Sequence, residues 1–556
     1  MSVFIGYPSF MAYQMMKGKK GNNDGFPSIP GMIARYSALG LTNEQMATNP
    51  VWVDKTGNGY DLQLKNFSWK EGSGISDVYL GALVFDGVDD YGVCDNFPVL
   101  TKEKGYTVVA LRQWIEEKNS VTALASNSKN WNQDGAFVFE YNNLENNYPN
   151  IEISFGSNNM FDRGLSPYSY QTSKSYNGNL IESGSFLGSD KLVVAKANEN
   201  LSPNSNIAIW EIVILDHDAT EEELTKIKDY FVKTYPWLFP DQAWTVTGKT
   251  NEDEDRATIA NITGNGNDLV LSNFGFAEGS GYGLYAENYA GGRRVQSTDR
   301  ADLTWTSYSV NITSVKVAST QLYYQSYPEQ PSFIVPSYKI KVYGLKDGQT
   351  LSYRQATSEG QQLYKISEDG TYTLPSFPFK ANGDWYGFTL NKVQESCDIT
   401  IEQIPEYEGY LVTDGVDDKI VSSVFRMGKD FTIVGDWKFI DNKRSGTGLV
   451  KGSSFYIYNT MTGLDLYINS GSVKNSLDGI KSINAACSDG RAYDRNWNEI
   501  LANTGNVVGS GGTLEVSSSG GRFDRIAFKN LAIYPRILSK DDCIKAYNYL
   551  QTLKAK

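Results

Sequence analysis

Histidine is nearly absent from this chain, whose 556 residues include only His217. A single imidazole excludes a two-histidine zinc site, and a Ser-His-Asp triad would have to use this one residue. No Gly-x-Ser-x-Gly segment occurs to supply a nucleophile. We therefore interpret His217 as a surface residue beside a helix and predict no catalytic residues.

Cysteine and positive charge are also scarce. The four cysteines show no paired spacing, which predicts neither a disulfide framework nor a zinc site. We expect four free, buried thiols: Cys94, Cys397, Cys487 and Cys543. The formal net charge is −13 at pH 7. Because binding to a phosphate backbone needs clustered Lys and Arg, this balance argues against nucleic acid as a partner.

Long apolar runs are missing as well. No stretch of about 18 uninterrupted apolar residues occurs, so we expect no insertion into a membrane. Residues 1–10 place no basic residue ahead of their apolar stretch, and we expect no signal peptide. The chain is predicted to be made in a cytoplasm without export by the usual route.

Aromatic residues and glycine are plentiful by contrast. The chain contains 36 Tyr, 25 Phe, 11 Trp and 52 Gly. Many short apolar runs are separated by Gly, Asn, Asp and Ser, a pattern typical of β-sandwiches. The predicted fold class is all-β.

One sequence motif pair occurs twice, at two different spacings. Residues 54–67 (DKTGNGYDLQLKNF) return as residues 261–274 (NITGNGNDLVLSNF), 207 residues later. Downstream, residues 81–90 (GALVFDGVDD) return as residues 409–418 (GYLVTDGVDD), but 328 residues later. The surplus of 121 residues is the size of a small domain. The sequence therefore predicts two copies of one module, with a domain inserted into the second.

The end of each copy is also repeated. Residues 207–215 and 526–534 predict a final apolar strand, and a helix follows each. Thr220 and Ser539 are the expected N-caps, and Thr220 with Glu223 fits a capping box. A surface connection accepts an inserted domain because the cost of loop closure grows slowly with length. The predicted domains are an N-terminal arm (1–29), a first jelly roll (30–240), a second jelly roll (241–295 and 406–556) and an insert (296–405).

The insert has a strand pattern of its own. Asp347-Gly348 and Asp369-Gly370 are hairpin-type dipeptides between alternating runs. We predict an immunoglobulin- or fibronectin-like sandwich of about seven strands.

The repeated features resemble laminin-G-like, concanavalin-A-like jelly-roll modules. The resemblance rests on the Asp-Gly-Val-Asp-Asp turn, the Thr-Gly-Asn-Gly-x-Asp-Leu segment and the closing strand with its capped helix. Residues 251–269 (NEDEDRATIANITGNGNDL) are in addition similar to modules in virion proteins of phages and prophages of Bacteroides-type gut bacteria. The resemblance covers residues 30–240, 245–295 and 406–556. It implies two antiparallel sandwiches that attach to surfaces or glycans.

Two acidic clusters are candidate calcium ligands: Asp86, Asp89 and Asp90, and their repeats Asp414, Asp417 and Asp418. Hard cations take clustered carboxylates from loops. However, Asp-Gly followed by Asp is also turn chemistry, in which the side chains bond nearby backbone amides. We favour the structural turn and predict no metal site and no cofactor, with calcium as the open alternative.

Paired carboxylates on a sandwich face would indicate a glycoside hydrolase. The Glu-x-Asp-x-(x)-Glu strand pattern of such enzymes does not occur. Residues 252–255 (EDED) are contiguous, which on a strand would place acids on both faces. We interpret them as the acidic first turn of a short surface helix, and predict a protein that is not an enzyme.

Glycan contact usually needs exposed aromatic residues beside amides or carboxylates. Residues 127–132, 141–149 and 384–386 have that composition, but ordinary loop or core is the simpler interpretation of each, so glycan-binding residues are left unassigned. The N-terminal arm has an apolar, Met-rich segment containing Tyr7, Phe10, Met11, Tyr13, Met15 and Met16. It either docks on a partner, including another copy in a homo-oligomer, or packs on its own sandwich.

The predicted function is that of a phage virion appendage, of tail or head fibre type, which attaches to host-surface glycans without catalysis. Its location is then the virion, and its partners are other virion proteins and host polysaccharide. Two alternatives stay open. One is a purely structural virion component that binds only other virion proteins, and the other is a glycan depolymerase of the jelly-roll fold.

Overall fold

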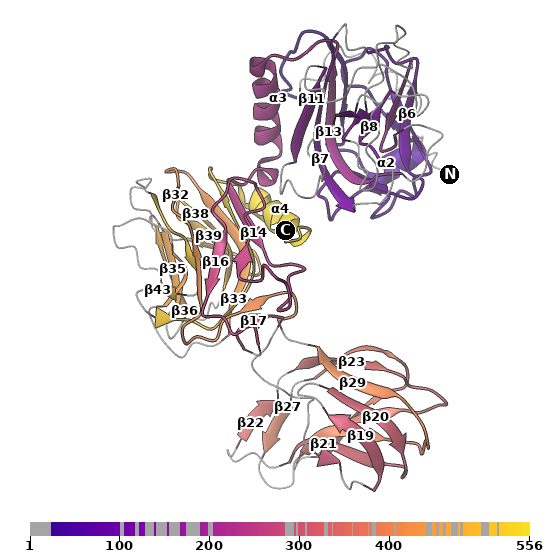
Figure 1. Cartoon of the computed structure of the whole chain (residues 1–556), viewed down its shortest axis with the longest axis vertical. Coiled ribbons are helices and arrows are strands. Elements are labelled where there is room, and N and C mark those ends of the chain that lie inside the picture. The colour runs from indigo at the N-terminus through magenta and orange to yellow at the C-terminus, as the bar shows by residue number, and fades with distance from the viewer. Residues whose placement is uncertain are drawn as a thin grey trace, which may run out of the picture.

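The computed structural model is built mainly of β-strands arranged as three sandwiches (Figure 1), which confirms the all-β fold class. It describes residues 24–100, 105–116, 122–127, 138–140, 153–154, 167–173, 190–197, 204–277, 279–283, 294–295, 299–305, 309–326, 332–335, 337–357, 360–375, 377–380, 385–404, 407–440, 447–451, 455–459, 463–468, 476–478, 482–501, 511–516, 518–519 and 522–555. Among these residues, no helix has the length and apolar character needed to cross a membrane.

The first sandwich consists of two facing sheets. Their strand orders are β11-β7-β13-β5-β4, with β1 paired to β13, and β10-β9-β8-β12-β6-β3-β2. Val108 and Ile212 of the one sheet and Leu64 and Leu192 of the other are buried between them. The strands are β1 (Met32–Ser37), β2 (Val51–Trp52), β3 (Leu62–Lys65), β4 (Gly74–Ile75), β5 (Leu83–Asp86), β6 (Tyr91–Asp95), β7 (Thr107–Glu116), β8 (Ala125–Ser126), β9 (Val138–Phe139), β10 (Ile153–Ser154), β11 (Tyr168–Thr172), β12 (Lys191–Val194) and β13 (Asn206–Leu215).

The second sandwich repeats this arrangement. Its sheets have the orders β17-β30-β45-β33-β38-β39-β40, with β14 paired to β45, and β15-β16-β31-β42-β34-β35-β36-β37. The run β17-β30-β45-β33-β38 corresponds strand for strand to β4-β5-β13-β7-β11 of the first sandwich. The strands are β14 (Gln242–Thr245), β15 (Thr258–Ile259), β16 (Leu269–Ser272), β17 (Gly281–Tyr282), β30 (Leu411–Val412), β31 (Lys419–Ser422), β33 (Thr432–Phe439), β34 (Thr447–Lys451), β35 (Phe455–Asn459), β36 (Gly463–Ile468), β37 (Ser476–Asp478), β38 (Ile483–Cys487), β39 (Arg491–Asp494), β40 (Glu499–Leu501), β42 (Glu515–Val516) and β45 (Ile526–Tyr534), with the small pairs β32 (Phe425–Arg426) and β41 (Gly511–Gly512), and β43 (Ser518–Ser519) and β44 (Arg522–Phe523).

The inserted sandwich has two five-stranded sheets, β18-β21-β28-β24-β25 and β19-β20-β29-β23-β26, and a two-stranded sheet, β22-β27. The prediction of about seven strands is therefore too low, because polar strands such as β25 lack the apolar alternation that marks a strand. The strands are β18 (Arg294–Val295), β19 (Ala301–Trp305), β20 (Ser309–Val315), β21 (Thr320–Ser326), β22 (Ser332–Val335), β23 (Tyr338–Tyr343), β24 (Leu351–Thr357), β25 (Gly360–Ile366), β26 (Gly370–Leu374), β27 (Phe377–Lys380), β28 (Trp385–Leu390) and β29 (Ile399–Ile404).

The two Asp-Gly dipeptides of the insert do not close hairpins. Asp347-Gly348 joins β23 to β24, and Asp369-Gly370 joins β25 to β26, so each turn crosses from one sheet to the other. The Asp369 carboxylate accepts hydrogen bonds from the backbone N–H groups of Gly344 and Leu345 at 2.9 and 2.8 Å. It thus fastens the two crossing connections together.

A third layer of helices joins the first and second sandwiches. This layer consists of α3 (Glu221–Thr234), the 3₁₀ turn η1 (Pro236–Leu238) and α4 (Lys540–Gln551), which form one buried apolar cluster with strands of both sandwiches. A further short helix, α2 (Asn43–Thr48), lies in the first sandwich. The predicted caps are confirmed, since Thr220 forms the full capping box with Glu223 and Ser539 accepts from the N–H of Asp542. In Figure 1, α4 lies between the two sandwiches.

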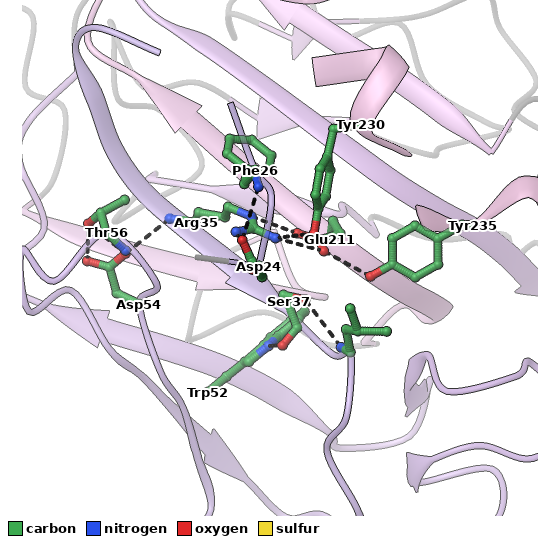
Figure 2. A network of polar contacts seen from close by, with 11 residues as sticks. Asp24, Phe26, Arg35, Ser37, Trp52, Asp54, Thr56, Glu211, Tyr230 and Tyr235 are labelled. Atoms are coloured by element: carbon green, nitrogen blue, oxygen red, sulfur yellow. Dashed lines mark hydrogen bonds and ion pairs between the residues drawn. The ribbon is translucent and has the colours of Figure 1, made fainter. Parts of the chain in front are cut away.

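A buried ion pair fastens the start of the first sandwich (Figure 2). Arg35 on β1 donates to both carboxylate oxygens of Glu211 on β13, at 3.0 and 3.2 Å, and to Asp24 at 2.8 Å. Its guanidinium group lies 4.0 Å from the ring centroid of Phe26 and also donates to the Tyr230 hydroxyl on α3. The segment 24–29 is thereby held against its own sandwich. Met11, Met15 and the rest of the predicted arm before residue 24 lie outside the described residues.

Candidate functional site

A pocket of about 460 Å³ opens at the end of the first sandwich, where β1 begins. Its polar groups come from Asn58, Tyr60 and Asp216, and its apolar wall includes Val99 and Leu100. These residues lie on the loop before β3, the connection after β6 and the loop after β13. The pocket therefore gathers three loops at one end of the sheets.

The repeated Thr-Gly-Asn-Gly loop positions two of these groups. The Asp54 carboxylate accepts hydrogen bonds from the backbone N–H groups of Arg35 and Thr56, at 3.1 and 2.9 Å, and so ties the loop to β1. Asn58 donates to the carbonyl of Ile33 at 2.8 Å. Gly57 and Gly59 on either side of Asn58 have φ values of 80° and 88°, which glycine adopts without strain.

The second copy uses the same bonds in the same places. Asn261 accepts from the N–H groups of Ala243 and Thr263, and Asn265 donates to the carbonyl of Asp241 at 2.7 Å. The Thr-Gly-Asn-Gly motif therefore holds the first strand of each sandwich in place through hydrogen bonds. What differs is the neighbouring residue, because Asn267 stands where the first copy has Tyr60.

His217 stands beside the pocket with a carboxylate on each ring nitrogen. Nδ1 lies 3.2 Å from Asp216 Oδ1, and Nε2 lies 3.2 Å from Glu223 Oε2. Burial lowers the pKa of His217, but the hydrogen bonds and charges of Asp216 and Glu223 outweigh it and raise the pKa above 6.5. Glu223 also caps α3 through Thr220. The imidazole thus links Asp216, which lines the pocket, to Glu223 at the start of α3. His217 lies at the surface beside a helix, as predicted from the sequence.

Two glycines make room for this loop. A Cβ atom on Gly31 would collide with the Asp216 carboxylate and the His217 ring, and one on Gly105 would lie 3.1 Å from the N–H of Asp218. Both glycines have positive φ values, 69° and 77°. Both glycines also line the pocket, so a larger side chain at either position would displace the loop that carries Asp216.

The pocket offers both polar and apolar contacts to a ligand. Carboxylate and amide groups accept and donate to hydroxyls, while a tyrosine ring and aliphatic side chains pack against C–H faces. A volume of about 460 Å³ lies in the range of small-molecule sites.

The sequence did not single out Asp216. The signal it offered was the acidic run Asp216-His217-Asp218 directly after a buried strand. In the second copy the same positions hold Pro535, Arg536 and Ile537, so this site belongs to the first copy alone.

The two Asp-Gly-Val-Asp-Asp turns close on themselves. Oδ1 of Asp86 accepts from the N–H groups of Val88, Asp89 and Asp90, at 2.7, 3.3 and 3.4 Å, and Oδ2 of Asp90 accepts from the N–H of Asp86. One ligand atom from each acid of a turn lies within 4.8 Å of the others. These carboxylates are the residues that could hold a cation, and backbone N–H groups already use two of them.

The second turn is built in the same way. Asp414 accepts from the N–H groups of Val416 and Asp417, and Asp418 accepts from the N–H of Asp414 at 2.8 Å. Burial raises the pKa of Asp90 and of Asp418 to about 6.

The acidic run 252–255 forms turns instead of the predicted helix start. Asp253 accepts from the N–H and hydroxyl of Thr250, and Asp255 pairs with Lys249 at 2.6 Å. These local bonds favour a turn over the first turn of a helix. Residues 128–132, 141–149 and 384 of the predicted aromatic loops lie outside the described residues.

A second buried charge pair lies inside the first sandwich. Arg112 on β7 donates to both oxygens of Glu140, and the Trp114 indole donates to Glu140 at 2.9 Å. Burial raises the pKa of Glu140, but the charge and hydrogen bonds of Arg112 outweigh it and hold the pKa below 4.5. Sequence analysis missed this pair because its residues, 28 apart, have no motif in common.

Comparisons with known proteins give matches among solved structures. No protein-family model and no curated protein matches the chain. Matches among solved structures include a Trypanosoma rangeli sialidase in complex with 2,3-difluorosialic acid (13% identity, TM-score 0.23, 39% of this chain and 37% of that chain). Another is the binding domain of botulinum neurotoxin DC in complex with SialylT (10% identity, TM-score 0.24, 68% and 95%). A third is the Sulfolobus turreted icosahedral virus structure (11% identity, TM-score 0.13, 92% and 99%).

The chain spans between 33% and 37% of the length of the first two sialidase structures. These likenesses are too distant to assign a substrate or a partner to this chain. None of the three is named as a protein of a Bacteroides-type phage.

The prediction that the protein is not an enzyme is corrected by these matches. It rested on a single histidine and a missing carboxylate pattern, whereas several matched structures are sialidases, which are enzymes. The absence of a linear carboxylate pattern does not exclude an active site, because carboxylates from separate strands and loops meet only in the folded chain. Whether this protein is an enzyme is therefore a question for an activity assay.

Proposed function

We propose that this protein attaches a phage virion to a carbohydrate on the surface of its bacterial host. The pocket beside β1 receives part of that carbohydrate. The observation that carries the proposal is the convergence of Asn58, Tyr60 and Asp216 on one pocket of about 460 Å³.

The pocket suits a sugar for physical reasons. Asp216 is 60% exposed at its side chain, so its carboxylate reaches solvent and can accept hydroxyl hydrogen bonds. Val99 is 39% exposed and offers an aliphatic surface beside it. Sugars present hydroxyls on their rims and C–H groups on their faces, which this combination matches.

The virion location is supported by the resemblance of residues 251–269 to phage virion modules. The chain has three sandwiches in a row, which suits an appendage that holds a binding surface away from its base (Figure 1). Other virion proteins and further copies of this chain are the proposed partners, and the N-terminal arm is the segment through which they would join.

The test is a binding array of bacterial surface polysaccharides probed with the full chain and three variants. Asp216→Asn removes the pocket carboxylate, and Val99→Lys places a long side chain at the pocket mouth. Glu222→Gln is the matched control, since Glu222 is an exposed carboxylate that pairs with Lys226 on α3, away from the residues that line the pocket. We expect binding to a subset of polysaccharides that falls at least tenfold in the first two variants and is unchanged in the control.

The same experiment separates the alternatives. Absence of binding by the full chain to every polysaccharide would leave a structural virion component. Binding that the two pocket variants retain would place the carbohydrate elsewhere on the chain. Polysaccharide recovered from the array in shortened form would assign depolymerase activity, which chromatography of the released sugars measures.

A further inference from the structure

Two of the four cysteines meet in the structure. Cys487 ends β38, and Cys543 lies in the first turn of α4, 56 residues later. Both are free and fully buried, and Cys487 Sγ lies 4.0 Å from the carbonyl oxygen of Leu538, the residue before the N-cap of α4. Among the described residues, Cys94 belongs to the first sandwich and Cys397 to the insert, so neither shares this cluster.

The chain around the pair is held in place. Thr432 on β33 lies directly opposite Cys487 in the sheet. Its hydroxyl donates to the carbonyl of Arg536 at 2.9 Å, accepts from the N–H of Leu538 at 2.9 Å and lies 3.6 Å from Cys487 Sγ. The segment that leads into α4 is thus fastened beside Cys487. Ser539 then starts the helix, and the N–H of Cys543 donates to the Ser539 carbonyl at 2.9 Å, one residue beyond the carbonyl that faces Cys487 Sγ.

We propose that Cys487 and Cys543 form a reversible disulfide that fastens α4 to the sheet. The oxidant is a small-molecule disulfide of the glutathione type. One thiolate attacks it and releases one glutathione thiolate, and the second cysteine then attacks the mixed disulfide and releases the other. Two protein thiols lose two protons and two electrons, one Sγ–Sγ bond forms, and the oxidant becomes two thiols.

The pair is chemically suited to this step. The neighbouring Cys543 lowers the pKa of Cys487, and Cys487 in turn raises the pKa of Cys543. Whichever of the two sulfurs is deprotonated attacks first, because the thiolate is the nucleophile. Since both sulfurs are buried, the reaction needs α4 to open at its first turn, and helix ends open more readily than sheet interiors.

The disulfide would act on more than one sandwich. Helix α4 belongs to the apolar cluster that also contains Trp210 and Val213 of the first sandwich. A cross-link at its first turn limits the opening of the whole layer, because it constrains the open state more than the closed one. Oxidation is thus expected to stiffen the joint between the first and second sandwiches.

The test is refolding of the full chain in a glutathione redox buffer, which removes any barrier of access to the buried thiols. Free thiols are then alkylated, and intact mass and peptide mapping are measured. We expect the loss of two hydrogen atoms, one cross-linked peptide pair containing Cys487 and Cys543, and alkylated Cys94 and Cys397. Amide hydrogen exchange in α4 should be slower in the oxidised form and return to its original rate after reduction.

Two variants control the result. Cys543→Ala should abolish the cross-link, whereas Cys94→Ala should leave it unchanged. Complete alkylation of Cys487 and Cys543 in the refolded protein would overturn the proposal, as would a cross-link that joins other cysteine pairs equally often. Peptide mapping of the unaltered chain distinguishes these outcomes even if Cys543→Ala fails to fold.

Discussion

Trp210 on β13 of the first sandwich meets Tyr549 on α4, the helix of the second, edge to face with ring centroids 6.2 Å apart. Both rings are buried. Arg536 also donates to the carbonyl of Val232 on α3, and Lys545 lies 4.2 Å from the ring centroid of Trp237. The closing helix of the second sandwich therefore shares one buried apolar cluster with strands of the first.

Truncation of Tyr549 is expected to loosen this joint. Tyr549→Ala should cost about 3 to 4 kcal/mol of unfolding free energy through the cavity it leaves. It should also separate one calorimetric transition into two, because the sandwiches lose their common core. Tyr549→Phe is the matched control. The Tyr549 hydroxyl has no hydrogen-bond partner among the described residues, so its removal should not destabilise the protein. An unchanged single transition in Tyr549→Ala would contradict the role of α4.

The pair Arg35 and Glu211 should behave as one unit. Arg35→Met leaves a buried, unpaired carboxylate and should cost about 3 to 5 kcal/mol in denaturant unfolding. Adding Glu211→Gln should recover much of this loss, because the second copy holds the uncharged Ala243 and Asn530 at these positions. Limited proteolysis before residue 35 should speed up in the single variant. Lys226→Met, at an exposed pair, should change neither measurement.

The buried acids Asp90 and Asp418 give the protein a stability that depends on pH. Their folded pKa of about 6 exceeds the ordinary 3.8, so the folded state holds more protons than the unfolded state between these values. Stability should therefore fall as pH rises from about 4 to about 6, by about 1 to 2 kcal/mol for each acid after solvent screening. Asp90→Asn should remove its part of the slope, whereas Asp89→Asn, at an exposed acid, should not. A flat profile in the unaltered chain would refute the burial effect.

His217 gives a single, unambiguous titration because it is the one histidine of the chain. Its folded pKa is raised, so the stability it contributes is present below pH 6.5 and is lost as pH rises through the folded pKa. Proton NMR of the imidazole should report a pKa above 6.5. Glu223→Gln should lower that value, and Glu222→Gln should leave it unchanged. A pKa at or below 6.5 in the unaltered protein would mean that the two carboxylates do not hold the ring.

Calcium should have no effect on thermal stability. Asp86 and Asp90 already accept hydrogen bonds from the backbone of their own turn. We therefore expect the same Tm with millimolar calcium and with a chelator, measured by calorimetry. A rise in Tm with calcium that disappears in Asp89→Asn would assign the turn to a metal, since Asp89 is exposed and its carboxylate is the group most available to an ion.

Much of the fold could be predicted because its signals are local. The Thr-Gly-Asn-Gly loops, the Asp-Gly-Val-Asp-Asp turns and the Thr220 cap are sets of residues whose side chains bond backbone groups a few positions away. Such bonds appear as short motifs, and duplication made them stand out. The prediction that residues 252–255 start a helix was wrong, because turns and helix starts use the same residue types.

The features that sequence reasoning missed are contacts between distant positions. Cys487 with Cys543, Arg112 with Glu140, and the pocket acid Asp216 have no motif that links them. Each contact depends on strand order and on how the helices pack against the sheets, which a single sequence does not encode as a pattern. The strand count of the insert was too low because its polar strands depend on their neighbours for stability.

The ends of the inserted sandwich lie side by side in the second sandwich. Gly281 and Tyr282 of β17 pair with Val412 and Leu411 of β30, and the N–H of Gly283 donates to the carbonyl of Tyr410 at 2.7 Å. The strands just before and just after the insertion, β17 and β30, therefore pair with each other within the sheet of the second sandwich. What the host fold requires of the intervening segment is therefore that its two ends lie close together.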